Sequence, residues 1–251
     1  MNHDECPLLS MLLSVLLLSV VPMGEGGRLV VRQLRHHQRL VPFQEAYQTQ
    51  RLLQEQQIAL QGGGASQCGY LYSVQHPPVY TLGTGLRETD LPLRSEHLND
   101  QLVFDTHRID RAGEATFHGP GQLVFYSILD LHYFNRDIHW YLRSLEAVII
   151  DSLKEFNIQG GRIQGFTGVW VGNSKVAAMG IKLTRWVTLH GFSVNVDVDL
   201  RYFNQIVPCG ISDRRVGNLV EWNSSLTLNG VAEVVERNFC RAFNVDLVPP
   251  N

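Results

Sequence analysis

Apolar and polar residues follow two different periods along the chain, which predicts a protein built from both helices and strands. From residue 137 to 156 apolar side chains return every three or four positions, the period of a helix with one buried face. Pro42 is expected to stand at the first position of another helix. Strands are predicted over residues 29–34, 68–75, 123–129, 168–171, 175–182 and 192–198, and a last helix over 231–243.

This order of elements mixes hairpins with helices and contains no internal repeat. A mixed or antiparallel sheet flanked by helices is consistent with this order of elements, so we predict an α+β fold. The length of 251 residues suits one large domain or two small ones, with a core of ordinary size.

The first 27 residues are expected to lie outside that domain. Residues 8–21 are almost wholly apolar, which resembles the apolar region of a signal sequence, although no basic residue precedes them. They are too few to span a bilayer, so stable membrane insertion is not expected. We predict a targeting or leader segment that is disordered or removed, and a wrongly chosen gene start is the alternative.

Composition narrows the partners and cofactors. The formal net charge of −3 does not favour a nucleic-acid partner. Only three of the 21 basic residues are lysines, and an arginine-rich surface suits recognition of an acidic partner. The four cysteines form no C-x-x-C pair and the ten histidines no H-x-x-x-H pair, so we expect neither a zinc site nor a disulfide framework. No cofactor is predicted.

One cysteine has a local sequence that suits a reactive thiol. Cys209 stands between Pro208 and Gly210, which predict a turn that presents the side chain at the end of a strand. A buried core cysteine is the alternative, and it describes Cys68 and Cys240 better because they lie in a predicted strand and a predicted helix.

One lysine could activate that thiol. Lys175 opens the apolar run 176–181, and a lysine entering a buried strand can have a lowered pKa and stabilise a thiolate. Strand alternation places Lys175 on the face opposite to Lys182, so only one of the two can face a given pocket. A solvated cation at a strand end is the alternative.

Residues 111–122 are dense in glycine, proline and polar groups, which predicts a loop whose backbone N–H groups can approach a ligand. Thr116 and His118 would be its polar anchors, and an ordinary turn is the alternative. His190 is more typical of a structural or surface group, but its place before Gly191 would also allow it to line the site.

Five segments, HPPVYTLGTG, RAGEATFHGPGQLV, GVWVGNSKVAAMGIK, HGFSVNV and FNQIVPCGISDR, occur in this order along the chain. Together they resemble the lipoyl(octanoyl) transferase family, and the resemblance runs from about Leu29 to Val248. It implies the α+β fold of the biotin/lipoate protein ligase superfamily and a single octanoyltransferase catalytic domain over residues 28–251.

The resemblance also implies a reaction. Octanoyl would pass from octanoyl-acyl carrier protein to a lysine of a lipoyl domain, in a 2-oxoacid dehydrogenase complex or in the glycine cleavage H protein. Cys209 would carry the acyl group as a thioester, and Lys175 would lower the pKa of Cys209. The implied substrate-binding residues form three groups: Arg111, Ala112, Gly113, Glu114, Ala115, Thr116, Phe117 and His118; Ala178, Met179 and Gly180; and Gly191, Phe192 and Ser193.

Ala112 departs from the family pattern, which usually has a second glycine there. Alanine is strained at that position only if the backbone needs a positive φ.

Three other functions would fit parts of the sequence. An ATP-dependent lipoate or biotin protein ligase could use the same fold, but it needs no nucleophilic cysteine. A thiol hydrolase could pair Cys209 with His118 or His190, and a non-catalytic octanoyl-binding protein would need neither Cys209 nor Lys175. Residues 137–146 and 203–208 look most like plastid-type members of the family, so we expect a plastid location, with the mitochondrion as the alternative.

Overall fold

The computed structural model describes residues 28–63, 67–86, 105–206 and 214–249. Two predictions lie outside these residues: the leader over 1–27 and the reactive Cys209. None of the described helices is long and apolar enough to cross a membrane.

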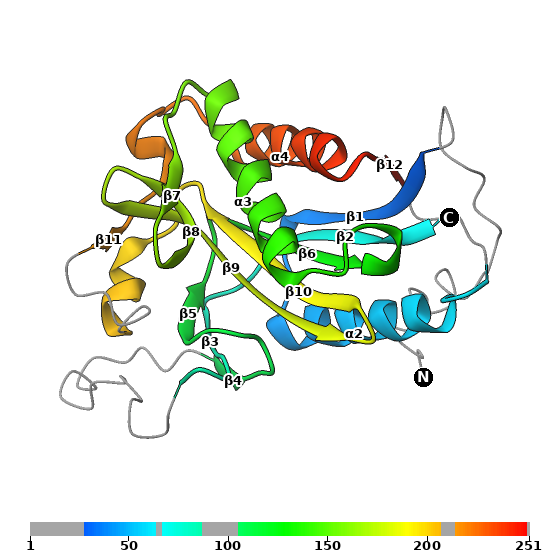
Figure 1. Cartoon of the computed structure of the whole chain (residues 1–251). Helices are drawn as coiled ribbons and strands as arrows, with labels where there is room; N and C mark the ends of the chain where they lie inside the picture. Colours follow the sequence, from blue (N-terminus) through cyan, green and yellow to red (C-terminus); the bar gives the residue numbers. More distant parts are fainter. Residues whose placement is uncertain (1–27, 64–66, 87–104, 207–213, 250–251) are drawn as a thin grey trace, which may run out of the picture.

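A long twisted sheet forms the centre of the molecule (Figure 1). Its strands are, in spatial order, β12 (Val245–Val248), β1 (Leu29–Leu40), β2 (Gln67–Gln75), β6 (Gln122–Leu129), β10 (Val187–Asn195), β9 (Ser174–Thr184), β8 (Phe166–Val171) and β7 (Gly161–Ile163). The short β11 (Arg215–Val216) pairs with β9. Because β1 runs parallel to β12 and β2 while β2, β6, β10, β9, β8 and β7 pair antiparallel, the sheet is mixed.

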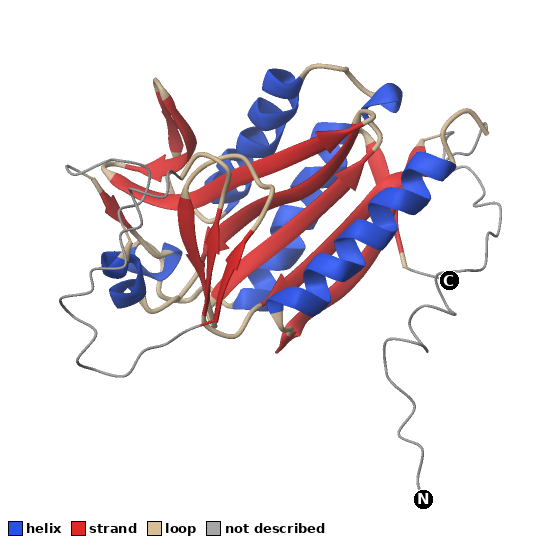
Figure 2. Cartoon of the chain, turned by 90° about the horizontal axis from the view of Figure 1, so that it is seen from below, coloured by secondary structure: helices blue, strands red, loops and turns tan. Residues whose placement is uncertain are grey.

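Helices cover both faces of this sheet. The helix α2 (Phe43–Ala59) lies on one face, and α3 (Ile138–Glu155) and α4 (Leu228–Phe243) lie on the other (Figures 1 and 2). Within the described residues, the short 3-10 helices η4 (Leu131–Tyr133), η5 (Leu200–Gln205) and η7 (Leu219–Glu221) lie in the connections. The predicted α+β fold, a mixed sheet flanked by helices, is confirmed.

The long helix α3 forms where the apolar period predicted it. Asp137 caps its start, since one carboxylate oxygen accepts hydrogen bonds from the backbone N–H groups of His139 at 2.7 Å and Trp140 at 3.2 Å. Tyr141 and Leu145 are completely buried against the sheet. Burying a large apolar side chain contributes about 1.5–3 kcal/mol, so the buried stripe rather than the cap dominates the stability of this helix.

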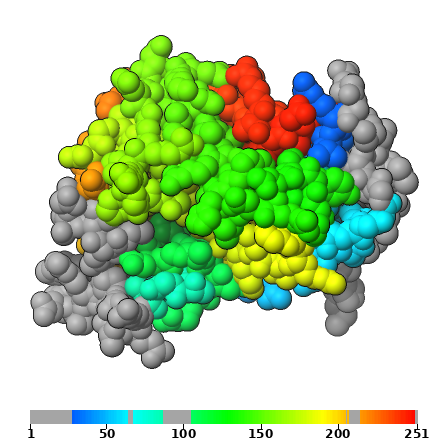
Figure 3. All heavy atoms as spheres, viewed as in Figure 1, coloured from blue at the N-terminus to red at the C-terminus, as the bar shows by residue number. Residues whose placement is uncertain are grey.

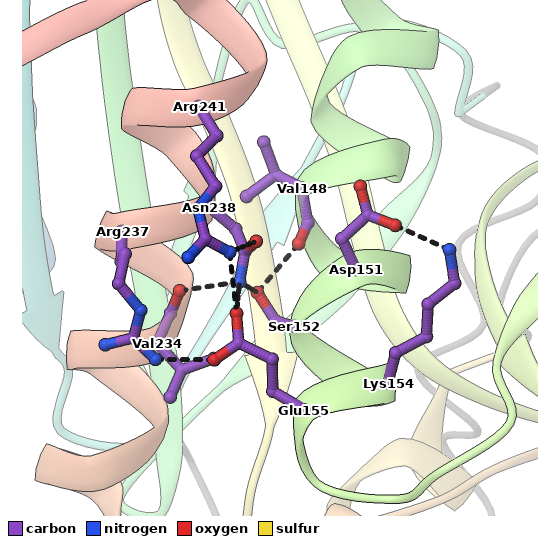
Figure 4. Close-up of polar contacts among 9 residues, drawn as sticks. All are labelled: Val148, Asp151, Ser152, Lys154, Glu155, Val234, Arg237, Asn238 and Arg241. Atoms are coloured by element: carbon purple, nitrogen blue, oxygen red, sulfur yellow. Dashed lines mark hydrogen bonds and ion pairs between the residues drawn. The ribbon is translucent and has the colours of Figure 1, made fainter.

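The far end of α3 contacts α4 through polar side chains (Figure 4). Glu155 accepts hydrogen bonds from Asn238 at 2.9 Å and from Arg241 at 3.1 Å, and it also pairs with Arg237. Asn238 further donates to Ser152 at 3.3 Å. The two helices on this face are therefore joined by a polar cluster at the surface as well as by apolar packing.

A second, small sheet stands beside the central one (Figure 1). It contains β4 (Asp105–Arg108), β3 (Val79–Leu82) and β5 (Ala115–His118), in that spatial order. The prediction of a continuous loop over 111–122 is wrong in its middle, because β5 pairs antiparallel with β3 there. Only the two ends of that segment are loops, and they flank a buried strand.

Several predicted boundaries also differ; the strand expected over 29–34, for example, runs to Leu40. The helix expected from residue 231 begins at Leu228, where the hydroxyl of Thr227 caps it by accepting from the N–H of Gly230 at 3.2 Å. The strand expected over 192–198 runs over Val187–Asn195. It ends there because the next two backbone N–H groups donate to the carbonyl oxygen of Gly121 instead of to a neighbouring strand.

Candidate active site

The loop over residues 111–114 is held in shape by hydrogen bonds to its own carbonyl groups. The N–H groups of Gly83, Thr84 and Gly85 donate to carbonyl oxygens of this loop at 3.2, 2.9 and 3.0 Å. Arg111 turns its guanidinium back on the loop, where it donates to the carbonyl oxygens of Glu114 at 2.7 Å and Ala112 at 2.9 Å. These hydrogen bonds fix the shape of the loop. They also join the sequence segments 76–85 and 111–124, which explains why both segments occur in the same protein.

The same loop lies directly on β9. The N–H of Ala112 donates to the carbonyl oxygen of Ile181 at 3.1 Å. A Cβ added to Gly180 would lie 2.7 Å from the carbonyl oxygen of Ala112 and 2.8 Å from Cδ of Arg111, so only glycine permits this approach. Positive φ falls on Gly113, at 95°, and not on Ala112, so the alanine in the place of the usual glycine is unstrained.

Between this loop, β9, β10 and α3 lies a cavity of ≈ 450 Å³. The space-filling view shows the surface hollowed between α3 and the small sheet (Figure 3). Ile138 and Leu142 of α3 and Phe166 of β8 also line it. A cavity of this size with mainly apolar walls suits a small ligand with a hydrocarbon chain.

The structure brings nearly all predicted binding residues to this cavity. Its walls include Arg111, Ala112, Gly113, Glu114, Ala115, Thr116, His118, Ala178, Met179, Gly180, Gly191, Phe192 and Ser193. Phe117 is the exception, since its side chain is fully buried away from the cavity walls. Its ring packs against Tyr80, Tyr202 and Phe203, so strand alternation turns it to the opposite side from Thr116 and His118.

Lys175 also lines the cavity, whereas Lys182 does not. Lys175 pairs with Trp170 across the β8–β9 hairpin, and its Nζ lies 5.6 Å from the centre of the Trp170 ring. Lys182 instead forms an ion pair with Asp110.

The segment that carries Cys209 adjoins the cavity at both ends. Cys209 itself lies outside the described residues, but Phe203 before it and Val216 after it both line the cavity. Val216 pairs with Lys175 in register, and the N–H of Gly217 donates to the carbonyl oxygen of Lys175 at 3.0 Å. The chain on the far side of residues 207–213 therefore runs beside Lys175.

The two described cysteines are poorly suited to be nucleophiles. Burial raises the pKa of the Cys68 thiol to about 12. Burial also raises the pKa of the Cys240 thiol above its ordinary value. Since the thiolate is the reactive form, burial makes both side chains poorer nucleophiles than an ordinary cysteine.

Buried polar side chains at the cavity form a chain that the sequence did not reveal. Nδ1 of His118 donates to the amide oxygen of Gln122 at 2.6 Å, and Gln122 donates to the side-chain oxygen of Asn195 at 2.9 Å. Burial and the neighbouring His76 lower the pKa of His118 to about 3, so the ring is neutral. Asn195 could have been found from its place among the polar positions of a half-buried strand, whereas nothing local distinguished Gln122.

A second polar group lies near the middle of β10. His190 is buried in the left-handed backbone region, with φ at 64°, and its Nε2 donates to Asp110 at 3.0 Å. Burial lowers the pKa of His190 to about 4 despite that carboxylate. Partial burial opposes ionisation of Asp110, but hydrogen bonds from Lys182, His190 and Tyr47 outweigh it and lower the pKa to about 2. The sequence pointed to His190 as a possible wall residue but not to Asp110.

No cluster of three or more histidine, cysteine, aspartate or glutamate side chains that could hold a metal ion occurs in the described part of the chain.

The family model of the lipoyl protein ligase A/B catalytic domain matches residues 45–240. The octanoyltransferase of Nostoc punctiforme is 45% identical over 215 residues, which cover 86% of this chain and 90% of that protein. The octanoyltransferase of Gloeobacter violaceus is 46% identical over 210 residues, 84% of this chain and 90% of that protein. The chain belongs to the octanoyltransferase family. The family resemblance of the five sequence segments is confirmed. The prediction that the protein is an acyltransferase is confirmed with it.

Solved structures agree on the fold at much lower identity. A lipoate-protein ligase A bound with ATP is 17% identical, with a TM-score of 0.67 over 88% of both chains. The putative lipoate protein ligase Ta0514 from T. acidophilum, with bound lipoic acid, is 14% identical, with a TM-score of 0.62 over 88% of both chains. These likenesses establish the fold alone.

Proposed function

We propose that the protein transfers an octanoyl group from octanoyl-acyl carrier protein to a lysine of a lipoyl domain, with Cys209 as the acyl carrier. The observation that carries the proposal is an apolar cavity with Lys175 in its wall, in a member of the octanoyltransferase family. The acceptor would be a lipoyl domain of a 2-oxoacid dehydrogenase complex or the glycine cleavage H protein.

The first half-reaction loads the enzyme. Lys175 takes the proton of the Cys209 thiol, and Sγ attacks the thioester carbon of the donor. The bond between that carbon and the sulfur of the phosphopantetheine arm breaks, and the departing sulfur receives the proton from Lys175. Because the donor is already a thioester, the exchange needs no ATP.

The second half-reaction unloads it. The amine nitrogen of the acceptor lysine attacks the acyl carbon, and the bond from that carbon to Sγ of Cys209 breaks. The proton that the amine loses passes through Lys175 to the Cys209 thiolate, which restores the starting state. The acyl chain would lie in the cavity during both steps, against Ala178, Met179 and Phe192.

Three features of the described residues support this assignment. The cavity walls are mainly apolar, as a hydrocarbon chain requires. Residues on both sides of the segment with Cys209 line the cavity. Burial raises the pKa values of the Cys68 and Cys240 thiols, which makes both poorer nucleophiles than an ordinary cysteine.

Transfer can be measured as a gain of mass by the acceptor. The full-length protein, octanoyl-acyl carrier protein and either acceptor are mixed, and the acceptor is weighed intact with time. We expect one octanoyl group on the acceptor with the wild type and with the control Cys240→Ser, and none with Cys209→Ser. Free octanoate without acylated acceptor would identify a thiol hydrolase and would overturn the proposal, as would full transfer by Cys209→Ser.

The plastid remains our predicted location, with the mitochondrion as the alternative. A fusion of residues 1–27 to a fluorescent protein, expressed in algal cells, is expected to enter plastids. Accumulation in mitochondria or in the secretory pathway would contradict this prediction.

A further inference from the structure

A completely buried carboxylate lies on the cavity side of α3. Glu146 has an exposed fraction of 0%, and it follows the cavity residues Ile138 and Leu142 at intervals of four. Residues four apart lie above one another on a helix, so the three side chains face the same side, toward β8 and β9.

Three donors satisfy this carboxylate. Oε2 of Glu146 accepts from the guanidinium groups of Arg143 at 2.6 Å and Arg162 at 2.7 Å. Oε1 accepts from the backbone N–H of Gly168 in β8 at 3.1 Å. A buried carboxylate is stable only when its charge is compensated, and the two arginines supply that compensation without a lysine. The remaining oxygen is thus committed to the backbone of β8.

Gly168 is the residue over which the Lys175 side chain passes. A Cβ added to Gly168 would lie 2.6 Å from Cε and 3.4 Å from Nζ of Lys175, and 2.8 Å from the carbonyl oxygen of Ala177. The φ of Gly168 is 133°, which side chains other than glycine rarely adopt. The ring of Trp170 lies beyond it, in contact with both Lys175 and the guanidinium of Arg214. The Lys175 side chain therefore lies against the stretch of β8 backbone that Glu146 holds.

We propose that Glu146 is a positioning residue for Lys175: through the N–H of Gly168 it fixes the backbone that directs the lysine side chain into the cavity. The inference rests on the proposed function, in which Lys175 activates Cys209. Arg143 and Arg162 pair with Glu146, Arg214 contacts the Trp170 ring, and Arg111, Glu114 and His118 line the same cavity as Lys175. The proposal assigns to Glu146 a hold on the backbone and not an electrostatic effect on the thiol.

The readout is the pH midpoint for alkylation of Cys209 by iodoacetamide, followed on the Cys209 peptide by mass spectrometry in the full-length protein. Lys175→Ala is measured first and is expected to raise the midpoint. Glu146→Leu, which removes the acceptor for Gly168, is expected to raise it by about one pH unit, a tenfold slower alkylation at a fixed pH below the midpoint. Glu146→Gln keeps an acceptor oxygen and is expected to fall between Glu146→Leu and the wild type.

A matched control is present on α4. Glu236 is also a buried carboxylate paired with an arginine, Arg35, but it lies away from the cavity. We expect Glu236→Leu to lower thermal stability without moving the alkylation midpoint. If Glu146 acted by its charge, removing that negative charge would lower the midpoint in both Glu146→Leu and Glu146→Gln, and this opposite sign would overturn the proposal. An unchanged midpoint in a folded Glu146→Leu protein would overturn it as well.

If Glu146→Leu does not fold, Gly168→Ala decides. Its new Cβ would displace the Lys175 side chain, so the midpoint should rise as in Lys175→Ala. Gly172→Ala is its control, because Gly172 also has a positive φ, at 56°, but has no atom within 4 Å of an added Cβ. Equal midpoints in Gly168→Ala and Gly172→Ala would contradict the proposal. An unchanged midpoint in Lys175→Ala would remove Lys175 from its role in the proposed function, whereas a shift in Lys175→Ala alone would reject only the role of Glu146.

Discussion

Two glutamates of α3 each hold two arginines, but on different sides of the helix and in different surroundings. Glu146 faces the cavity with a side-chain exposure of 1%, and Glu155 faces α4 with an exposure of 32%. Besides the hydrogen bonds from its arginines, Glu146 accepts one from a backbone N–H of the central sheet. Glu155 instead accepts one from the side-chain amide of Asn238 (Figure 4). The number of ion pairs is the same, so it does not distinguish the two regions.

Burial and the identity of the third partner do distinguish them. An exposed ion pair contributes little, because water and salt screen it and its long side chains lose entropy. Removing a partner from a buried hydrogen bond leaves a polar group unsatisfied, which costs about 1–3 kcal/mol. We therefore expect Glu146 to be sensitive to substitution and Glu155 to be more tolerant of it.

The largest expected effect comes from acid. Burial lowers the pKa of His76 and His190 to about 4 and, with His76 nearby, that of His118 to about 3, from an ordinary value of 6.5. Between pH 6.5 and 4 the unfolded chain binds protons at these rings that the folded protein does not bind. The free energy of unfolding should therefore decrease as the pH is lowered, by up to about 1.4 kcal/mol per pH unit for each histidine.

Urea denaturation at pH 7, 6 and 5 measures this slope. His190→Gln is expected to flatten it, and His139→Gln, at an exposed position on α3, should leave it unchanged. A stability that does not vary between pH 7 and 5 would show that these three histidines are not buried as neutral rings.

The next effect is the stability difference between the two glutamates. Glu146→Leu is expected to lower the free energy of unfolding by about 1–3 kcal/mol, since the N–H of Gly168 loses its acceptor. Glu155→Leu should lower it by less than about 1 kcal/mol. Urea denaturation measures both values. Equal decreases in the free energy of unfolding for the two variants would contradict the difference between the two sides of α3.

The smallest expected effect is the dependence of the Glu155 contribution to stability on salt and on acidic pH. Hydrogen bonds from Arg237 and Asn238 lower the pKa of Glu155, so its contribution is present above its ordinary pKa and is lost as pH falls through the lowered value. Raising the salt concentration to 1 M at pH 7 should remove much of that contribution from the wild type and change Glu155→Leu less. If salt narrowed the gap between wild type and Glu146→Leu equally, the buried site would be as screened as the exposed one.

Most of the fold followed from periodicity, and the exceptions have physical causes. Tyr141 and Leu145 mark the buried face of α3 in the sequence as they do in the structure. The strand β5 was missed because it has four residues between glycine-rich ends, and its partner β3 is distant in the sequence. The early start of β10 was hidden by His190 and Gly191, where the left-handed residue interrupts strand alternation.

The site was predictable where the sequence segments carry it and not where it depends on distant contacts. Residues 111–114, as part of the loop predicted over 111–122, and Lys175 were named from their segments, and the structure places them around one cavity. Asp110 and Glu146 gave no local signal, because their partners lie in other elements: His190 and Lys182 for the first, Arg162 and Gly168 for the second. Phe117 was included by its position in a segment, although strand alternation turns it away.

The most direct test of the account is the position of the acyl group before any acceptor is added. The full-length protein is mixed with octanoyl-acyl carrier protein, quenched with acid and digested, and each cysteine peptide is weighed. We predict one octanoyl thioester, on the peptide with Cys209, formed more slowly in Lys175→Ala. An octanoyl group on Cys68 or Cys240, or acceptor acylation with no adduct on Cys209 at any time, would contradict the account.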